Sequence, residues 1–353
     1  MQFAQNILKN GNKNFSMIKS FIRSFALFYI SNKQELETLI RNPFFKLGFL
    51  IKIVFIICAS PTINTNLFIP FINNIFSNFS FDPWTSFVEV GGDINSFPYG
   101  ISMLASYLPL ATFGSLLDKY FIDFEFTELL FKTTSLLFDF FILINLSFLI
   151  KSKSKNLLIL SYWLSPIIFY TTYVHGQIDI VPVFFLISCI SAISFNKYLF
   201  AGVLLAIAIS CKFSMLIALP FILIYIHRRR GISREFYRFL FFFILLTVLL
   251  TLPFLGSYGY WDMVFRTKEL ERVYTVFVPY GENLKLYIVP LVYIFSLYLI
   301  LRIKKITQDL FLISTGIGFF SILIFLPPAP GWAVWTLPFL AYYQIRSKRD
   351  LFA

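Results

Sequence analysis

Charged side chains are scarce in this sequence. Asp, Glu, Lys and Arg make up only 14% of the 353 residues, whereas soluble domains carry about 25%. Hydrophobic residues account for 58% of the chain, and phenylalanine alone occurs 47 times. Because so few polar residues could not cover a water-facing surface, the composition excludes an ordinary soluble domain and indicates a protein embedded in lipid.

The motifs of nucleotide binding are also missing. The sequence contains neither GxGxxG nor GxxxxGK followed by Ser or Thr, and none of its polar segments is long enough for a βαβ unit. An enzyme that uses a nucleotide-activated sugar is therefore not expected. Cys58, Cys189 and Cys211 lie in or near apolar runs without the spacing of metal ligands, and we interpret them as buried hydrophobic residues.

Apolar runs fill most of the chain. A helix needs roughly 20 apolar residues to cross a bilayer, and such runs recur between residues 44 and 345. They predict an all-α, polytopic helical membrane protein with about ten transmembrane helices in one domain, residues 44–345. The predicted spans are 44–63, 126–150, 156–174, 178–195, 198–211, 213–227, 236–255, 284–301, 308–326 and 331–345.

The positive charges lie between these runs. The net charge is +12, but its distribution along the chain argues against a nucleic-acid partner and follows the positive-inside rule, which places such clusters in the cytoplasm. Both termini are then cytoplasmic, and we expect a multi-pass protein of a bacterial inner membrane. The clusters are residues 1–46, KSKSK at 151–155, Lys197, the Arg-rich stretch from 228, residues 302–305 and the tail 346–353.

The first 43 residues form a separate segment. Their apolar stretch FSMIKSFIRSFALFYI is interrupted by Lys19 and Arg23 and lacks the small-residue cleavage site of a secretory signal. We interpret residues 1–43 as a cytoplasmic or interfacial amphipathic segment.

The first outer segment, residues 64–125, contains one further apolar stretch at 100–117. If that stretch crossed the bilayer, KSKSK would lie outside, against the positive-inside rule. We therefore expect a re-entrant or interfacial helix there. The same segment contains Asp82, Glu89 and Asp93 among aromatic and turn residues. These acids either form a solvated loop, or one of them is a general base, since apolar neighbours make a carboxylate bind a proton more readily.

Other polar residues crowd into short turns between spans. His175, Gln177 and Asp179 lie in the turn HGQID, where Asp179 could either cap the following helix or contribute to a site. His175 and Asp179 alone are too few ligands to define a metal site. Within the span 126–150, we expect Asp139 to face the bundle and pair with a neighbouring helix, in preference to a role in proton relay.

Outer-facing cations could neutralise a phosphate headgroup. Arg266, Lys268 and Arg272 alternate with Glu269 and Glu271, which also fits a solvated face. Lys212, between two short apolar helices, would be costly to leave unpaired, and we weigh a functional role and a structural role for it equally.

Four stretches carry a resemblance to a known family. They are DPWTSFVEVGGDINSFPYGISMLASYLPL, SPIIFYTTYVHGQIDIVPVFFLI, AGVLLAIAISCKFSMLIALPFIL and PPAPGWAVWTLPF. In motifs and layout the chain resembles the GT-C superfamily of membrane glycosyltransferases, and within it the mannosyltransferase-like members that use polyprenyl-phosphate sugars. The resemblance covers about residues 44 to 345. In that family a first span leads to a long outer loop with an acidic residue and membrane-surface helices, which would account for residues 100–117.

The resemblance implies transfer of a sugar, at the outer membrane face, from a polyprenyl-phosphate donor to a glycan or lipid-linked acceptor, with inversion and with a carboxylate of the first loop as base. Asp82 is the first choice for that base, Asp93 the second and Glu89 the third. His175, Gln177 and Asp179 would line the substrate pocket, and Lys212 would lie near the donor phosphate with Arg266 or Lys268. Trp332 and Trp335 would stack on sugar or prenyl chain, and an aromatic belt at the membrane interface explains these two tryptophans equally well. Many members carry two adjacent acids in the first loop, and this chain does not, so a divalent cation stays an open possibility.

Two other functions fit a polytopic chain of this kind. A transporter or flippase of a lipid-linked glycan would use intramembrane charges such as Lys132, Asp139 and Lys212. The sequence shows no internal repeat that relates two halves, and its polar residues cluster on one predicted face. A glycan polymerase or ligase would normally have its large outer loop late in the chain, whereas here it comes first.

Overall fold

The computed structural model describes residues 33–121, 123–150, 155–266, 271–281, 284–326 and 330–347. The predicted amphipathic stretch near the N-terminus, most of KSKSK and Lys268 lie outside these residues. The described chain is helical apart from one antiparallel hairpin, β1 (Phe277–Tyr280) and β2 (Leu284–Tyr287), which confirms the predicted predominance of helix. The predicted span 284–301 was wrong at its start, because residues 284–287 pair as a strand and α16 (Ile288–Arg302) begins after them.

Within the described ranges, five helical segments are long and apolar enough to cross a membrane by themselves. Shorter apolar helices such as α10 and α11 have 15 and 14 residues and therefore reach only about 22 Å of a hydrocarbon core that is about 30 Å thick. Five candidate spans are thus shown, and the count of about ten stays a prediction. The five are α6 (Ile101–Asp118), α7 (Phe126–Ile150), the segment Lys155–Val174, the segment Arg234–Phe254 and α17 (Gln308–Phe325).

The remaining elements connect or flank these spans. Before α6 come α2 (Lys33–Arg41), α3 (Pro43–Cys58), the π-turn η1 (Asn64–Phe68), α4 (Ile69–Ser77) and α5 (Pro83–Glu89). After α7 come α8 (Lys155–Leu158), η2 (Ile159–Trp163), α9 (Pro166–Ile168), η3 (Phe169–Val174), α10 (Ile180–Ser194), α11 (Tyr198–Cys211), η4 (Phe213–Ile217), α12 (Ala218–Arg230), α13 (Arg234–Thr251), η5 (Leu252–Phe254), α14 (Tyr258–Tyr260), η6 (Trp261–Phe265) and η7 (Arg272–Tyr274). The chain ends with η8 (Pro330–Trp332) and α18 (Ala333–Arg346).

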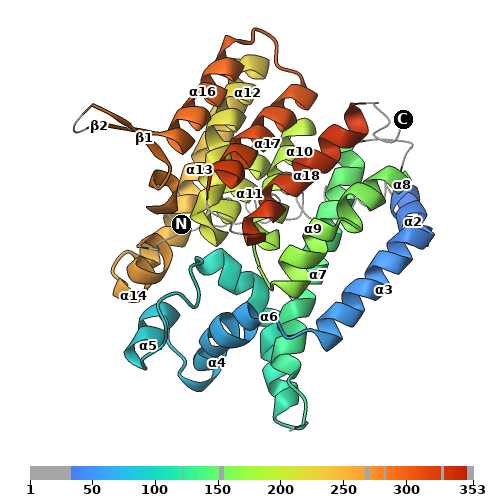
Figure 1. Ribbon diagram of the computed structural model, residues 1–353, viewed down its shortest axis with the longest axis vertical. Coiled ribbons are helices and arrows are strands. Elements are labelled where there is room, and N and C mark those ends of the chain that lie inside the picture. The colour runs from blue at the N-terminus through green and yellow to red at the C-terminus, as the bar shows by residue number, and fades with distance from the viewer. Residues whose placement is uncertain are drawn as a thin grey trace, which may run out of the picture.

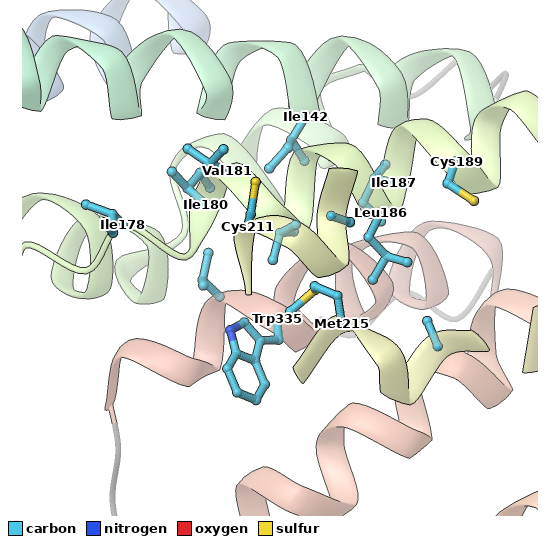
Figure 2. Packing of buried hydrophobic residues seen from close by; sticks show 14 of the residues in the cluster. Ile142, Ile178, Ile180, Val181, Leu186, Ile187, Cys189, Cys211, Met215 and Trp335 are labelled. Carbon is cyan, nitrogen blue, oxygen red and sulfur yellow. The ribbon is translucent and has the colours of Figure 1, made fainter. Parts of the chain in front are cut away.

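The core forms around α10 and α11, which lie in the middle of the bundle (Figure 1). α10 is apolar on all sides, as expected of a helix buried all round, and its side chains pack against those of α7, η4 and α18 (Figure 2). On α11, Gly202 lies so close to α13 that an added Cβ would meet the Phe239 carbonyl oxygen. Such small residues allow close helix contact where lipid gives no hydrophobic drive for association.

The helices α6 and α7 form an antiparallel pair. Near their shared end, Gly114 packs against the backbone of Thr127, and further along Tyr107 bonds Ser135 at 2.7 Å. In Figure 1 this pair extends below the other helices, close to α4 and α5. α6 therefore runs beside α7, and because α6 is itself long and apolar enough to cross a membrane, its re-entrant or interfacial placement stays a prediction.

An ion pair joins α3 to α7 inside the bundle. Lys52 and Asp139 are both completely buried, and the distance from Lys52 Nζ to Asp139 Oδ2 is 2.7 Å. The prediction that Asp139 pairs with a neighbouring helix is confirmed. About two helical turns closer to the start of α7, Lys132 pairs with Glu128 at 2.9 Å and donates to the Ala59 carbonyl.

Candidate functional site

Four segments that are distant in sequence meet at the outer ends of the predicted spans. The backbone N–H of Gly100 donates to the Cys211 carbonyl at 3.2 Å, and Ser102 donates to Ser210 at 2.9 Å. From the other side, Gly331 packs so tightly on Gln177 that an added Cβ would clash with its side chain. We call the cluster formed by Tyr99, Gln177, Asp179, Lys212, Trp332 and Trp335 the outer junction.

Asp179 is the centre of the outer junction. Its carboxylate is completely buried and accepts hydrogen bonds from Tyr99 at 2.8 Å, from the Trp335 indole at 2.7 Å and from Lys212 at 3.1 Å. Gln177 donates to the Tyr99 hydroxyl at 3.0 Å, which joins two of the three polar residues of the HGQID turn in one network. A buried carboxylate needs several such donors to offset its loss of hydration.

Lys212 lies among aromatic rings. Its Nζ is 4.9 Å from the ring centre of Tyr99, 5.4 Å from that of Trp335 and 6.0 Å from that of Trp332. The two indoles stack with their centres 5.0 Å apart, and the Arg272 guanidinium lies 6.0 Å from the ring centre of Trp332. Ring faces attract cations, so two positive groups are held around one indole, in an arrangement suited to an anionic headgroup with an apolar tail.

The helices determine how these side chains are presented. Lys212 follows α11 directly and adopts an extended backbone conformation before η4, so its side chain leaves the helix at a turn. Asp179 precedes α10, but its side chain makes no capping bond to that helix. Asp179 thus occupies the N-cap position of α10, but the carboxylate is engaged by donors from other segments instead of by the N–H groups of that helix.

The acids of the first outer segment do not contact Asp179. Asp82 caps α5, accepting from the Thr85 N–H at 3.2 Å, and it also accepts from the Ser257 hydroxyl at 2.9 Å. Trp84, in the same helix, donates to the Tyr99 carbonyl at 3.2 Å. Asp82 thus lies two residues before Trp84, the residue of α5 that contacts the junction.

The other two acids are exposed. Asp93 accepts from the N–H and from the side-chain amide of Asn95, within its own turn, at 2.9 and 2.8 Å. Glu89 ends α5 on the molecular surface. In their present positions these two carboxylates are less shielded than Asp82, which is half-buried.

The remaining predicted residues lie at the edge of the outer junction. His175 is half-buried and stacks on Tyr170, and burial lowers its pKa below the ordinary value of 6.5. It is therefore neutral near pH 7 and contributes no charge to the site. Arg266 is exposed and pairs with Asp262 at 2.8 Å, and Lys268 lies outside the described residues.

No match was found between this chain and any family model, any curated protein or any solved structure.

Neither a cluster of metal ligands nor the surface hollow of the described chain lies at the junction. Within the described ranges, no three His, Cys, Asp or Glu side chains gather as metal ligands would, so the residues at the junction do not fit a protein-held divalent cation. A hollow lined by Gln34, Glu37, Thr38, Arg41 and Asn42 lies beside α2, whereas the junction lies at the other end of α3, where Gly176 packs on Asn64.

The sequence did not single out Tyr99, Lys52 or Ser257. Tyr99 is one of 19 tyrosines, and only its contact with Asp179 distinguishes it. Lys52 carried a usable signal, because a lysine within an apolar run must find a partner in the bundle. Ser257 carried none, since its bond to Asp82 joins residues 175 positions apart.

Proposed function

We propose that this protein is a membrane glycosyltransferase that moves a sugar from a polyprenyl-phosphate donor to a glycan or lipid-linked acceptor at the outer face of the membrane. The outer junction supports this proposal best. Each of the four stretches that carry the GT-C resemblance contributes at least one residue to the junction: Tyr99, Asp179, Lys212 and Trp335.

The donor in this proposal is bound by charge and by lipid partitioning. The prenyl tail remains in the bilayer, and the phosphate lies near Lys212 and Arg272, the two cations beside Trp332. Asp179 acts on Lys212 through the 3.0 Å ion pair, which positions the ammonium group. Since the lipid anchors the donor, no nucleotide-binding domain is needed, in agreement with the absence of nucleotide-binding motifs.

In the proposed reaction, a carboxylate takes the proton of the acceptor hydroxyl while the acceptor oxygen bonds to the anomeric carbon. The bond from that carbon to the phosphate oxygen breaks, and polyprenyl phosphate leaves with the electron pair, so the configuration inverts. Asp82 is the preferred base because α5 also supplies Trp84, which contacts Tyr99 of the junction. Asp93 and Glu89 follow, since both are exposed.

The experiment is a transfer assay with the purified protein in nanodiscs, using a panel of polyprenyl-phosphate hexoses and a polyprenyl-linked saccharide acceptor. We expect Asp82→Asn to lower the rate at least about 100-fold, the range by which general base catalysis contributes. Asp123→Asn is the matched control, because Asp123 is an exposed acid of the same outer segment. Its rate should equal that of the unchanged protein.

Two results would contradict this proposal. If Asp82→Asn and Asp93→Asn both retain full transfer, the mechanism is wrong. If no hexose is transferred although the nanodisc sample is folded, the assignment as a glycosyltransferase fails for these donors.

A transporter is the second candidate, and the buried pair Lys52–Asp139 favours it, because charges within a membrane often mark a substrate path. Movement of a lipid-linked glycan across proteoliposomes, without sugar transfer and with both Asp82→Asn and Asp93→Asn in place, would select this function over the enzyme.

A further inference from the structure

The pair Lys52–Asp139 is the most deeply buried charged group in the described chain outside the junction. Lys52 Nζ lies 3.2 Å from the ring centre of Trp163, so the aromatic ring covers the ammonium group on one side. Asp139 Oδ2 accepts from Lys52 and from the Tyr173 hydroxyl, both at 2.7 Å. This oxygen is therefore fully engaged.

Two π-helical turns surround the ion pair. η2 supplies Tyr162 and Trp163, and η3 supplies Tyr173. Between them, Pro166 begins α9 and Ser165 caps it, so the segment Lys155–Val174 is interrupted twice beside the charges. Isolated π-turns within helical segments frequently mark functional sites, which points to a role beyond packing.

Two buried polar atoms at this place have no hydrogen-bond partner: Asp139 Oδ1 and the Tyr162 hydroxyl. The Tyr162 hydroxyl lies within interaction distance of the Asp139 carboxylate, although it has no partner at hydrogen-bond geometry. Buried polar groups are almost always hydrogen-bonded, to protein or to ordered water. Asp139 Oδ1 needs a hydrogen-bond donor, and the Tyr162 hydroxyl needs an acceptor. A single small polar molecule that both donates and accepts would satisfy the two atoms.

We propose that this cluster is an internal water site. One water molecule accepts a hydrogen bond from the Tyr162 hydroxyl and donates one to Asp139 Oδ1. A metal cation is unsuited to the position because the Lys52 ammonium group already lies 2.7 Å from the other carboxylate oxygen. The water completes the shell of the carboxylate and links η2 to α7, as Tyr173 links η3 to α7. The inference does not depend on the proposed function.

Substitution of Tyr162 by Phe gives opposite results with and without the water. If the water is present, Tyr162→Phe breaks its hydrogen bond and should lower the Tm of the full-length protein in nanodiscs by about 2 °C. If the site is dry, the same change removes an unsatisfied buried hydroxyl, and the Tm should stay the same or rise. An unchanged or raised Tm would overturn the proposal.

Infrared difference spectroscopy in H₂¹⁸O tests the water directly. An isotope-sensitive O–H band of an internal water should be present in the unchanged protein and absent in Tyr162→Phe. Ser191→Ala is the matched control, because Ser191 also carries a buried hydroxyl without a partner, on α10. That variant should retain the band, and loss of the band in Ser191→Ala but not in Tyr162→Phe would assign the water to another place.

Discussion

Asp179 and Lys212 illustrate what a buried charge requires. Each is buried, and the ion pair is accompanied by donors from Tyr99 and Trp335. Burial of two charges costs hydration free energy. Removing one partner therefore lowers the free energy of unfolding far more than replacing both by apolar residues of similar size. The pair is therefore better explained by the orientation it gives Lys212 than by stability.

Single and double substitutions of this pair test the explanation. Asp179→Asn should lower the free energy of unfolding by about 3 kcal/mol, because Lys212 loses the charge that balances it. Asp179→Leu combined with Lys212→Met should recover most of this loss while sugar transfer stays abolished. Thermal unfolding followed by tryptophan fluorescence measures the first effect, and the transfer assay measures the second. A double variant as unstable as Asp179→Asn would contradict the argument.

The side chain of Asp118 caps the start of α7 at the turn between α6 and α7. Asp118, at the end of α6, accepts from the backbone N–H groups of Phe126 and Thr127 at 2.6 and 3.1 Å and from the Thr127 hydroxyl. These are the first N–H groups of α7, which have no partner within the helix. α6 thus begins at the outer junction, next to Tyr99, and ends where α7 begins.

Removing this cap should loosen the pair. Asp118→Ala should lower the free energy of unfolding by about 1 to 2 kcal/mol, and amide exchange should accelerate at residues 126–130. Asp118→Asn should have a smaller effect, because asparagine is an equally good cap. Hydrogen exchange measured by mass spectrometry distinguishes the variants. Equal exchange in Asp118→Ala and the unchanged protein would show that apolar contacts alone hold the turn.

At the scale of the whole molecule, a run of arginines marks one end of the bundle. The last turn of α12, with Arg228, Arg229 and Arg230, lies at the upper end in Figure 1, while α4, α5 and the start of α7 lie at the lower end. The positive-inside rule would place the arginine run in the cytoplasm, and this orientation stays a prediction.

Cysteine labelling in intact cells tests that orientation. In a chain with Cys58, Cys189 and Cys211 replaced by Ala, a membrane-impermeant maleimide should label a cysteine at position 123 and should not label one at position 229 until the cells are opened. Both positions are exposed, so access depends on the side of the membrane alone. Labelling of position 229 but not 123 in intact cells would invert the topology and place the outer junction in the cytoplasm.

The sequence by itself determined the class of the protein and most of its helices. Composition and the length of apolar runs are local properties, and they predicted α7 and α11 with the bounds that the structure shows. They also singled out Asp179 and Lys212 as polar residues that need a partner, since an uncompensated charge in an apolar run is unfavourable whatever the fold.

Only the tertiary structure decided which partners those residues have. Asp179 receives donors from Tyr99 and Trp335, which are 80 and 156 positions away, and Lys52 meets Asp139 across 87 positions. A single sequence carries no signal for such pairs, because many phenols and indoles could satisfy the same carboxylate. The packing of the helices selects among them, and it also engages Asp82 with Thr85 and Ser257 instead of with the junction.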